Sequence, residues 1–233
     1  MFSSFASSTY KIDASYKYND ILKENYQTFW TIYEGESKKT GLKVSIFKFD
    51  KKKFESYVVD KQSRKLTYKK IEDDITNLQK IKHPNFLSII EPIEAHSSSF
   101  IFVSEYITDN IRGMYGKNTE INMNSRAGGM ANNSIVFKKG IYELAKALDF
   151  MHNVMKKVVI SLNPDNIFID AKGNWKIGSL LNMGSVNDSY FELDYSSDYE
   201  YGLDVNYFAP EIVFNSKFYY QSDYFSLGLI AYY

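Results

Sequence analysis

The sequence has no cysteine, and this absence excludes a disulfide framework and any thiolate metal site. Histidine is scarce as well: His83, His96 and His152 are scattered and do not form the cluster that a zinc site needs. Charge of neither sign is in excess, because 28 Lys and Arg residues balance 28 Asp and Glu residues. We therefore expect no direct nucleic-acid binding, since any such binding would need a local basic patch.

Long hydrophobic runs are also missing. No stretch approaches the roughly 20 apolar residues of a membrane span, and the N-terminus lacks the charged start and apolar run of a secretory signal. We expect a cytoplasmic protein, since the reducing cytosol suits a chain without cysteine. Residues 1–20, rich in Ser and Tyr, are predicted to form a flexible N-terminal arm. The 44% of hydrophobic residues in 233 suffices for a stable core.

The first half of the chain alternates strand-like and helical patterns. Runs rich in β-branched and aromatic residues predict strands at 30–33, 44–49 and 100–106. Apolar residues at the spacing of one helix face predict a helix over 69–81, and His83-Pro84-Asn85 ends it.

The second half begins with a segment of different composition. Residues 108–134 are rich in Gly, Asn and Ser, and the part near 112–134 is predicted to be a flexible insert. Beyond it, the pattern predicts a helix over residues 136–151, short strands at 158–160 and 167–169, and a helix that begins near Tyr224.

Several short motifs follow one another in a fixed order. They are His83-Pro84-Asn85, Ser104-Glu105-Tyr106, Leu162-Asn163-Pro164-Asp165-Asn166, Trp175-Lys176-Ile177, Ala209-Pro210-Glu211 and Ser222-Asp223-Tyr224-Phe225-Ser226-Leu227-Gly228. This order resembles that of a eukaryotic protein kinase domain. The resemblance implies an α+β, two-lobed kinase-like fold, with an N-lobe over residues 21–107 and a partial C-lobe over 108–233 that is truncated in the family's αF helix.

The residues that transfer phosphate in kinases are replaced. Phosphoryl transfer needs a Gly-rich loop, a lysine on the phosphates, an acidic base and an aspartate that holds Mg²⁺. The first glycine is Gly35, too late for such a loop, and Phe47 stands at the lysine position. Ser161 replaces the base and Ser179 the metal-binding aspartate. We therefore predict no catalytic residue and no metal site, and no cofactor beyond weak ATP binding, in which Asn166 would take part if a nucleotide binds.

An alternative from the enzyme class stays open at this point. An atypical Ser/Thr protein kinase could use Lys48 or another lysine with Asn166, and Asp165 or Asp170 as the base. Lys48 follows Phe47 in a predicted strand, so it should point away from the cleft. Asp165 and Asp170 are likewise expected to face elsewhere. Asp74 stands at the position of the αC glutamate, but we expect a solvent-exposed helix acid there.

The motifs narrow the resemblance further. The strand Val44-Ser45-Ile46-Phe47, together with Trp30, Ile90-Glu91-Pro92 and Ala209-Pro210-Glu211-Ile212, is similar to the Scy-like family of pseudokinases. That family implies an inactive kinase-like scaffold in Golgi and endosomal vesicle trafficking. Its expected partners are vesicle coat or adaptor proteins, and association with Golgi or endosomal membranes is expected only through those partners.

The same resemblance makes three structural predictions. Asp223 should accept hydrogen bonds from the backbone near residues 159–161. Glu211 should lack the arginine partner that it has in complete kinase domains. The apolar side chains of residues 224–233, including Phe225 and Ile230, should lie partly uncovered and make the chain prone to association.

Overall fold

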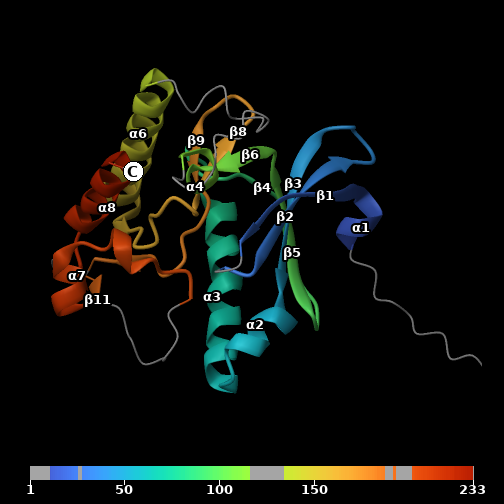
Figure 1. The fold of residues 1–233 in the computed structure, drawn as a ribbon, viewed down its shortest axis with the longest axis horizontal. Coiled ribbons are helices and arrows are strands. Elements are labelled where there is room, and N and C mark those ends of the chain that lie inside the picture. The colour runs from blue at the N-terminus through green and yellow to red at the C-terminus, as the bar shows by residue number, and fades with distance from the viewer. Residues whose placement is uncertain (1–10, 26–27, 116–133, 187–190, 193–200, 233) are drawn as a thin grey trace, which may run out of the picture.

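The computed structural model describes residues 11–25, 28–115, 134–186, 191–192 and 201–232. It has two parts, a sheet and a mostly helical part, and the long helix α3 (Lys61–Lys80) lies between them (Figure 1). Among the described residues, no helix combines the length and hydropathy that crossing a bilayer requires.

The first part is an antiparallel sheet with the strand order β1-β2-β3-β5-β4. The strands are β1 (Tyr16–Asn25), β2 (Trp30–Ser37), β3 (Lys43–Asp50), β4 (Ile89–Ala95) and β5 (Ser99–Glu105). The β-branched and aromatic residues of β3 and β5 are nearly all buried, which explains why both strands are evident from the sequence. In this register Phe47 lies opposite Ile32 and Phe102.

The N-terminal arm is shorter than predicted. From Lys11 onward the chain forms α1 (Lys11–Ser15) and β1, so the expected flexible arm over residues 1–20 is wrong for this portion; residues 1–10 lie outside the described residues. Ile12 and Tyr16 are buried on the face of the sheet opposite Phe47. The pairing of β1 with β2 and these two buried side chains hold the segment, and two apolar positions are too few to stand out in a polar stretch.

Helix α3 begins earlier than predicted. It starts at Lys61, directly after Asp60, whose side chain caps the helix by accepting a hydrogen bond from the backbone N of Ser63. The first half of α3 is basic and polar, and its apolar stripe begins only at Ile71, so periodicity located only the second half. The short helix α2 (Lys51–Tyr57) precedes it and packs against β5.

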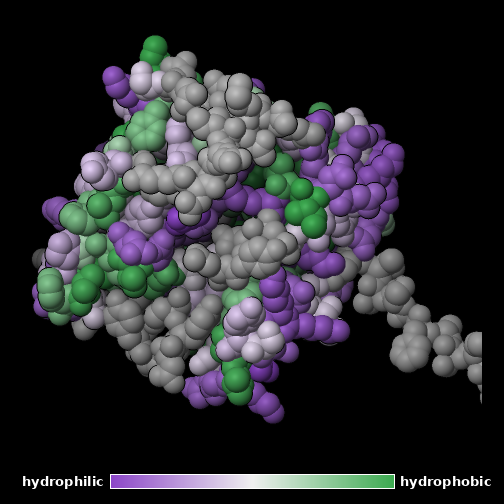
Figure 2. Space-filling view, in the orientation of Figure 1, coloured by the Kyte–Doolittle hydropathy of each residue, from purple (hydrophilic) through white to green (hydrophobic). Residues whose placement is uncertain are grey.

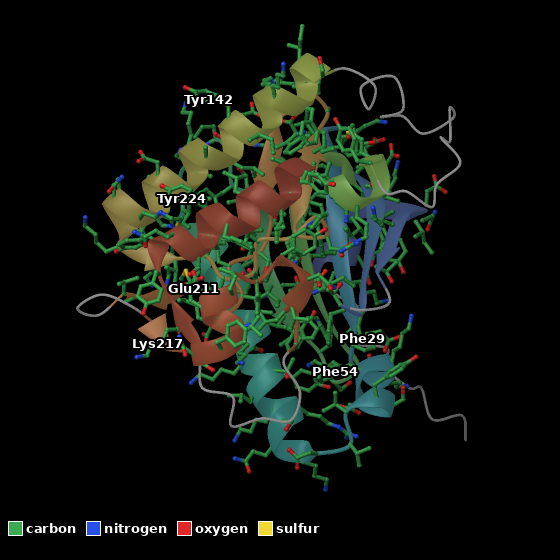
Figure 3. The ribbon with its side chains drawn as sticks, turned by 60° about the vertical axis from the view of Figure 1, so that its left-hand side comes forward. Phe29, Phe54, Tyr142, Glu211, Lys217 and Tyr224 are labelled. Carbon is green, nitrogen blue, oxygen red and sulfur yellow. The ribbon has the colours of Figure 1, made fainter. Side chains whose placement is uncertain are left out.

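The second part is built around two helices that pack together. α6 (Ser134–Asp149) continues into the π-helical turn η1 (Phe150–Met155), and α8 (Tyr220–Tyr232) packs against α6. Figure 3 shows α6 and α8 side by side, with Tyr142 on one and Tyr224 on the other. The remaining elements are α4 (Ile111–Tyr115), α7 (Pro210–Asn215), η2 (Val205–Tyr207), β6 (Ile107–Asn110), β7 (Lys157–Val158), β8 (Ile167–Asp170), β9 (Trp175–Ile177), β10 (Gly184–Ser185), β11 (Phe191–Glu192) and β12 (Lys217–Phe218).

The insert predicted near 112–134 is only partly described. Its first residues belong to α4, which follows β6 directly, and β6 pairs with β8. The prediction of a flexible segment is therefore wrong up to Tyr115, because Ile111 and Met114 are buried in the core. Residues 116–133 lie outside the described residues.

Helix α8 has one apolar side in the core and another in solvent. Leu227 and Ile230 are buried in the main core, contrary to the expectation that Ile230 lies uncovered. Phe225 and Tyr232 are 42% and 90% exposed. Glu211 accepts a hydrogen bond from the Ser222 hydroxyl at 2.6 Å, and among the described residues it has no ion pair.

Candidate nucleotide cleft

The lining of a small cavity comes from both parts of the molecule. The cavity has a volume of about 50 Å³, and its lining includes Ile32, Phe47, Asp74, Asn166 and Ser179. These residues come from the sheet, from α3 and from the segments next to β8 and β9. Three of the positions predicted from the kinase motifs, Phe47, Asn166 and Ser179, therefore meet at one place.

Aromatic rings fill the wall that the sheet contributes. The Phe47 ring is stacked on Phe102, with centroids 4.6 Å apart and planes 13° from parallel. Phe168 of β8 meets Phe47 edge to face at 5.5 Å, and Trp30 of β2 meets Phe102 in the same way at 5.3 Å. Such contacts add free energy beyond that of burial alone. The lysine position is thus part of a packed core, with Phe47 only 4% exposed.

A hydrogen bond within the protein holds the segment that links the two parts. The backbone N of Ile107, the first residue of β6, donates a hydrogen bond of 3.0 Å to the hydroxyl of Ser45, which is fully buried in β3. This backbone donor therefore already has a partner from the protein itself.

Neutral side chains and one carboxyl connect the remaining motif positions. The Ser179 hydroxyl donates to Asp74 Oδ2 at 2.8 Å, and the backbone N of Leu180 donates to Asp74 Oδ1 at 2.6 Å. The Ser161 hydroxyl lies 3.4 Å from the Ser179 carbonyl oxygen, and Asn166 Nδ2 donates to the Ser161 carbonyl at 3.0 Å. These positions form one hydrogen-bonded chain from α3 to the loop before β8.

Asp74 is the unusual member of this chain. The prediction of a solvent-exposed acid is wrong, because Asp74 is buried at 8% exposure on the side of α3 that faces the second part. Burial raises the pKa of its carboxyl from 3.8 to about 7, although the hydrogen bonds from Leu180 and Ser179 act in the opposite direction. The sequence signal for Asp74 was its place in the apolar stripe, three residues after Ile71 and one before Ile75.

The loop that carries Ser161 keeps a special backbone conformation. Ile160 has a φ of +63°, a left-handed value that is rare for a β-branched residue. The carboxylate of Asp223 holds it there, accepting hydrogen bonds from the backbone N of Val159 at 2.8 Å and of Ile160 at 3.1 Å. His152 Nε2 lies 2.8 Å from the same carboxylate. The predicted role of Asp223 is confirmed.

A lysine that the motifs did not predict lies in the cleft. Lys23 of β1 is the one cationic side chain among the described residues that line the cavity. Its amino group pairs with Asp109 at 2.8 Å and contacts Asn110 Oδ1, both in β6. This contact joins the two parts of the molecule. No kinase motif places a lysine in β1, so the sequence contained no signal for it.

The other candidates from the enzyme alternative lie in different surroundings. Lys48 is not among the residues that line the cavity. Asp165 does line it, contrary to expectation, but its carboxylate pairs with Arg112 at 2.5 Å. Asp170 accepts hydrogen bonds from the backbone N of Lys172 and Asn174 in the turn between β8 and β9.

Tyr201 closes another side of the cleft. Its hydroxyl donates a hydrogen bond of 2.6 Å to the Thr28 carbonyl, just before β2. Its ring is 3% exposed and packs edge to face on Phe49 and Phe54. Figure 3 shows Phe54 close to Phe29 beside α2, and their centroids are 5.4 Å apart.

The side chains of this cleft do not match the needs of Mg²⁺ and a triphosphate. Phosphates require cationic or backbone donors, and Mg²⁺ requires hard oxygen ligands, usually carboxylates. Lys23 is engaged by Asp109, and the described residues include no cluster of three or more His, Asp or Glu side chains that could hold a metal ion. The phenyl ring of Phe47 offers neither charge nor hydrogen bonds.

Comparison with known proteins assigns the chain to a class. The protein kinase domain family matches residues 28–233, so the chain belongs to the protein kinase domain family. Within it, the chain belongs to the Scy-like group. It is 37% identical over 227 residues to "Protein kinase-like protein SCY1" of Saccharomyces cerevisiae, covering 88% of this chain and 28% of that protein.

Two further relatives extend the comparison. "Protein kinase domain-containing protein ppk32" of Schizosaccharomyces pombe is 29% identical over 233 residues, covering 91% of this chain and 31% of the relative. "Probable inactive serine/threonine-protein kinase scy1" of Dictyostelium discoideum is 25% identical over 167 residues, covering 70% of this chain and 17% of the relative. The chain thus spans less than a third of the length of each of these relatives.

Proposed function

We propose that this kinase-like domain is catalytically inactive and acts as a binding scaffold. The observation that carries the proposal is the Phe47 ring, stacked on Phe102 at the position of the phosphate-binding lysine. Ser161 and Ser179, at the positions of the base and the metal ligand, are hydrogen-bonded to their neighbours. Removing a single electrostatic group from an active site typically costs about 3–4 kcal/mol of transition-state stabilisation, and here three are replaced.

The contacts across the cleft fit a scaffold better than an enzyme that must open and close. Lys23 joins β1 to β6, Asp74 joins α3 to the segment after β9, and Tyr201 joins the chain before α7 to Thr28. A domain held in one arrangement presents a preformed surface, which lowers the entropic cost of binding a partner.

We further propose that the scaffold works in Golgi and endosomal vesicle trafficking, through vesicle coat or adaptor proteins. This proposal rests on membership of the Scy-like group and on the same resemblance that the Val44–Phe47 strand carries. The Dictyostelium relative is named a probable inactive serine/threonine-protein kinase, which supports the absence of phosphotransfer.

One observation favours a second candidate, an atypical Ser/Thr protein kinase. Lys23 is a cation inside the cleft, and Asn166 stands where kinases bind a metal ion. For this function Lys23 would have to leave Asp109 and contact phosphates, and Asp165 would have to leave Arg112 to act as the base. The first function needs no such rearrangement.

The test uses the full-length protein in cells that lack their own copy. A scaffold should restore transport of a Golgi reporter equally well as the unaltered protein and as the variant Asn166→Ala, and neither protein should transfer labelled phosphate. Restoration by the unaltered protein alone, together with phosphate transfer that Asn166→Ala abolishes, would favour the kinase. Failure of the unaltered protein to restore transport would overturn the trafficking role.

A further inference from the structure

The corner formed by α2 and the first half of α3 concentrates positive charge. Residues 51–70 contain eight Lys or Arg residues and two acidic residues, in a chain with 28 of each sign. The other 20 basic and 26 acidic residues are spread over the rest of the chain. We call residues 51–70 the basic elbow. It forms the lower end of the molecule in Figure 1.

The charge of the elbow is directed outward. Lys52, Lys61, Lys65 and Lys69 are exposed, and within the described part of the chain none of them forms an ion pair. Lys61, Lys65 and Lys69 are four residues apart, so they share one face of α3. This face is opposite the stripe that packs on the core. Lys51 points inward instead, with its amino group 3.8 Å from the centre of the Phe100 ring.

The two acids of the elbow have structural partners. Asp60 caps α3 by accepting a hydrogen bond from the backbone N of Ser63 at 2.6 Å, and Glu55 accepts one from the Tyr68 hydroxyl at 2.9 Å. Arg64 Nη2 donates to the Glu55 carbonyl at 2.8 Å and so ties α3 to α2. The lysines therefore stand on a corner that Arg64 ties together, and each of the two acids has a hydrogen-bond partner within the elbow.

Apolar side chains project at the same corner. Tyr57 is 70% exposed, Val59 between the two helices is 81% exposed, and Leu66 is 40% exposed. Figure 2 shows hydrophobic surface at the lower end of the molecule with hydrophilic surface on both sides of it. Exposed apolar side chains surrounded by lysines are typical of surfaces that enter the headgroup region of a membrane.

We propose that the basic elbow binds directly to the surface of an anionic bilayer. The exposed lysines would contact lipid phosphates, and Tyr57 and Val59 would enter the headgroup region. A bilayer fits better than a nucleic acid, because a nucleic acid offers the exposed apolar tips no apolar phase. It also fits better than an acidic protein, because a projecting corner would need a matching hollow in that protein, whereas the headgroup region of a bilayer accepts a convex surface. This inference differs from the expectation that membrane contact runs through partners alone, and it does not depend on the cleft.

The test measures flotation of the 233-residue chain with two kinds of vesicle. One contains phosphatidylcholine alone and the other about 30% phosphatidylserine. We expect binding to the anionic vesicles only, weakening as salt is added. Each lysine near such a surface contributes about a fivefold gain in affinity, so the variant Lys61→Gln/Lys65→Gln/Lys69→Gln should bind on the order of 100-fold more weakly. The matched control Lys39→Gln/Lys138→Gln/Lys172→Gln changes three exposed lysines elsewhere and should bind within about twofold of the unaltered chain.

A second variant tests the apolar tip. Val59→Gln leaves the charge unchanged and should weaken binding about fivefold through the lost apolar contact; it also decides the matter if the triple variant does not fold. Circular dichroism melts check the fold of each variant. The proposal is overturned if the unaltered chain does not float with anionic vesicles, or if the elbow and control variants bind alike. Tighter binding of a single-stranded oligonucleotide than of the vesicles would overturn it as well.

Discussion

The buried carboxyl of Asp74 makes stability depend on pH in a way that can be calculated. Its pKa is about 7 in the folded protein and near 3.8 when exposed. From about pH 4 to about pH 7 the folded state therefore holds a proton that the unfolded chain has lost, so the free energy of unfolding falls as the pH rises. Three pKa units correspond to about 4 kcal/mol, of which about 3 kcal/mol falls between pH 5 and pH 8.

The variant Asp74→Asn isolates this contribution, because an amide of the same shape does not titrate. Urea unfolding of both proteins at about pH 5 and about pH 8 gives the difference in free energy of unfolding at each pH. That difference, variant minus unaltered chain, should rise by about 3 kcal/mol toward pH 8. The exposed neighbour supplies the control, since Asp73→Asn should show no such rise. A difference for Asp74→Asn that stays constant or falls with pH would show that the carboxyl is ionised, and the reasoning would be refuted.

Three further predictions concern the cleft and its supports. Phe47→Ala should lower the free energy of unfolding, measured in urea, by about 3–5 kcal/mol, because removing a ring that is 4% exposed leaves a cavity. The milder variant Phe47→Leu should lose less, and a smaller loss for Phe47→Ala than for Phe47→Leu would contradict the packing. Asp223→Ala should cost about 1–3 kcal/mol by leaving the backbone N of Val159 and Ile160 without their acceptor, and an unchanged melting temperature would count against that contact. Incubation with labelled ATP should give no autophosphorylation, and a signal that Asn166→Ala abolishes would show that the cleft is active.

The motif order was sufficient to predict the class of fold and to bring Phe47 and Ser179 to one cavity. The motif order has this predictive value because each motif forms a particular local structure, such as the turn whose backbone N–H groups bind Asp223. The backbone position of Ser161 depends on that turn, so counting along the sequence located it without any knowledge of the packing.

The features that the sequence did not predict depend on contacts between distant parts of the chain or on packing. Lys23 and Tyr201 reach the cleft through contacts over 86 and 173 residues of separation, which no local pattern reveals. Asp74 was predicted to be exposed because charged residues are normally exposed to solvent. Its burial results from the packing of α3 against the second part of the molecule. The start of α3 was missed because basic residues on a helix leave no apolar periodicity.

The prediction that the cleft binds Mg·ATP weakly at most can be tested by calorimetry. Mg·ATP is titrated into the folded 233-residue chain, and a cooperative melt of the same sample establishes that the chain is native. We expect no binding heat up to about 1 mM nucleotide, which corresponds to less than about 4 kcal/mol of binding free energy. A dissociation constant near about 10 µM that requires Mg²⁺ and is lost in Asn166→Ala would contradict it.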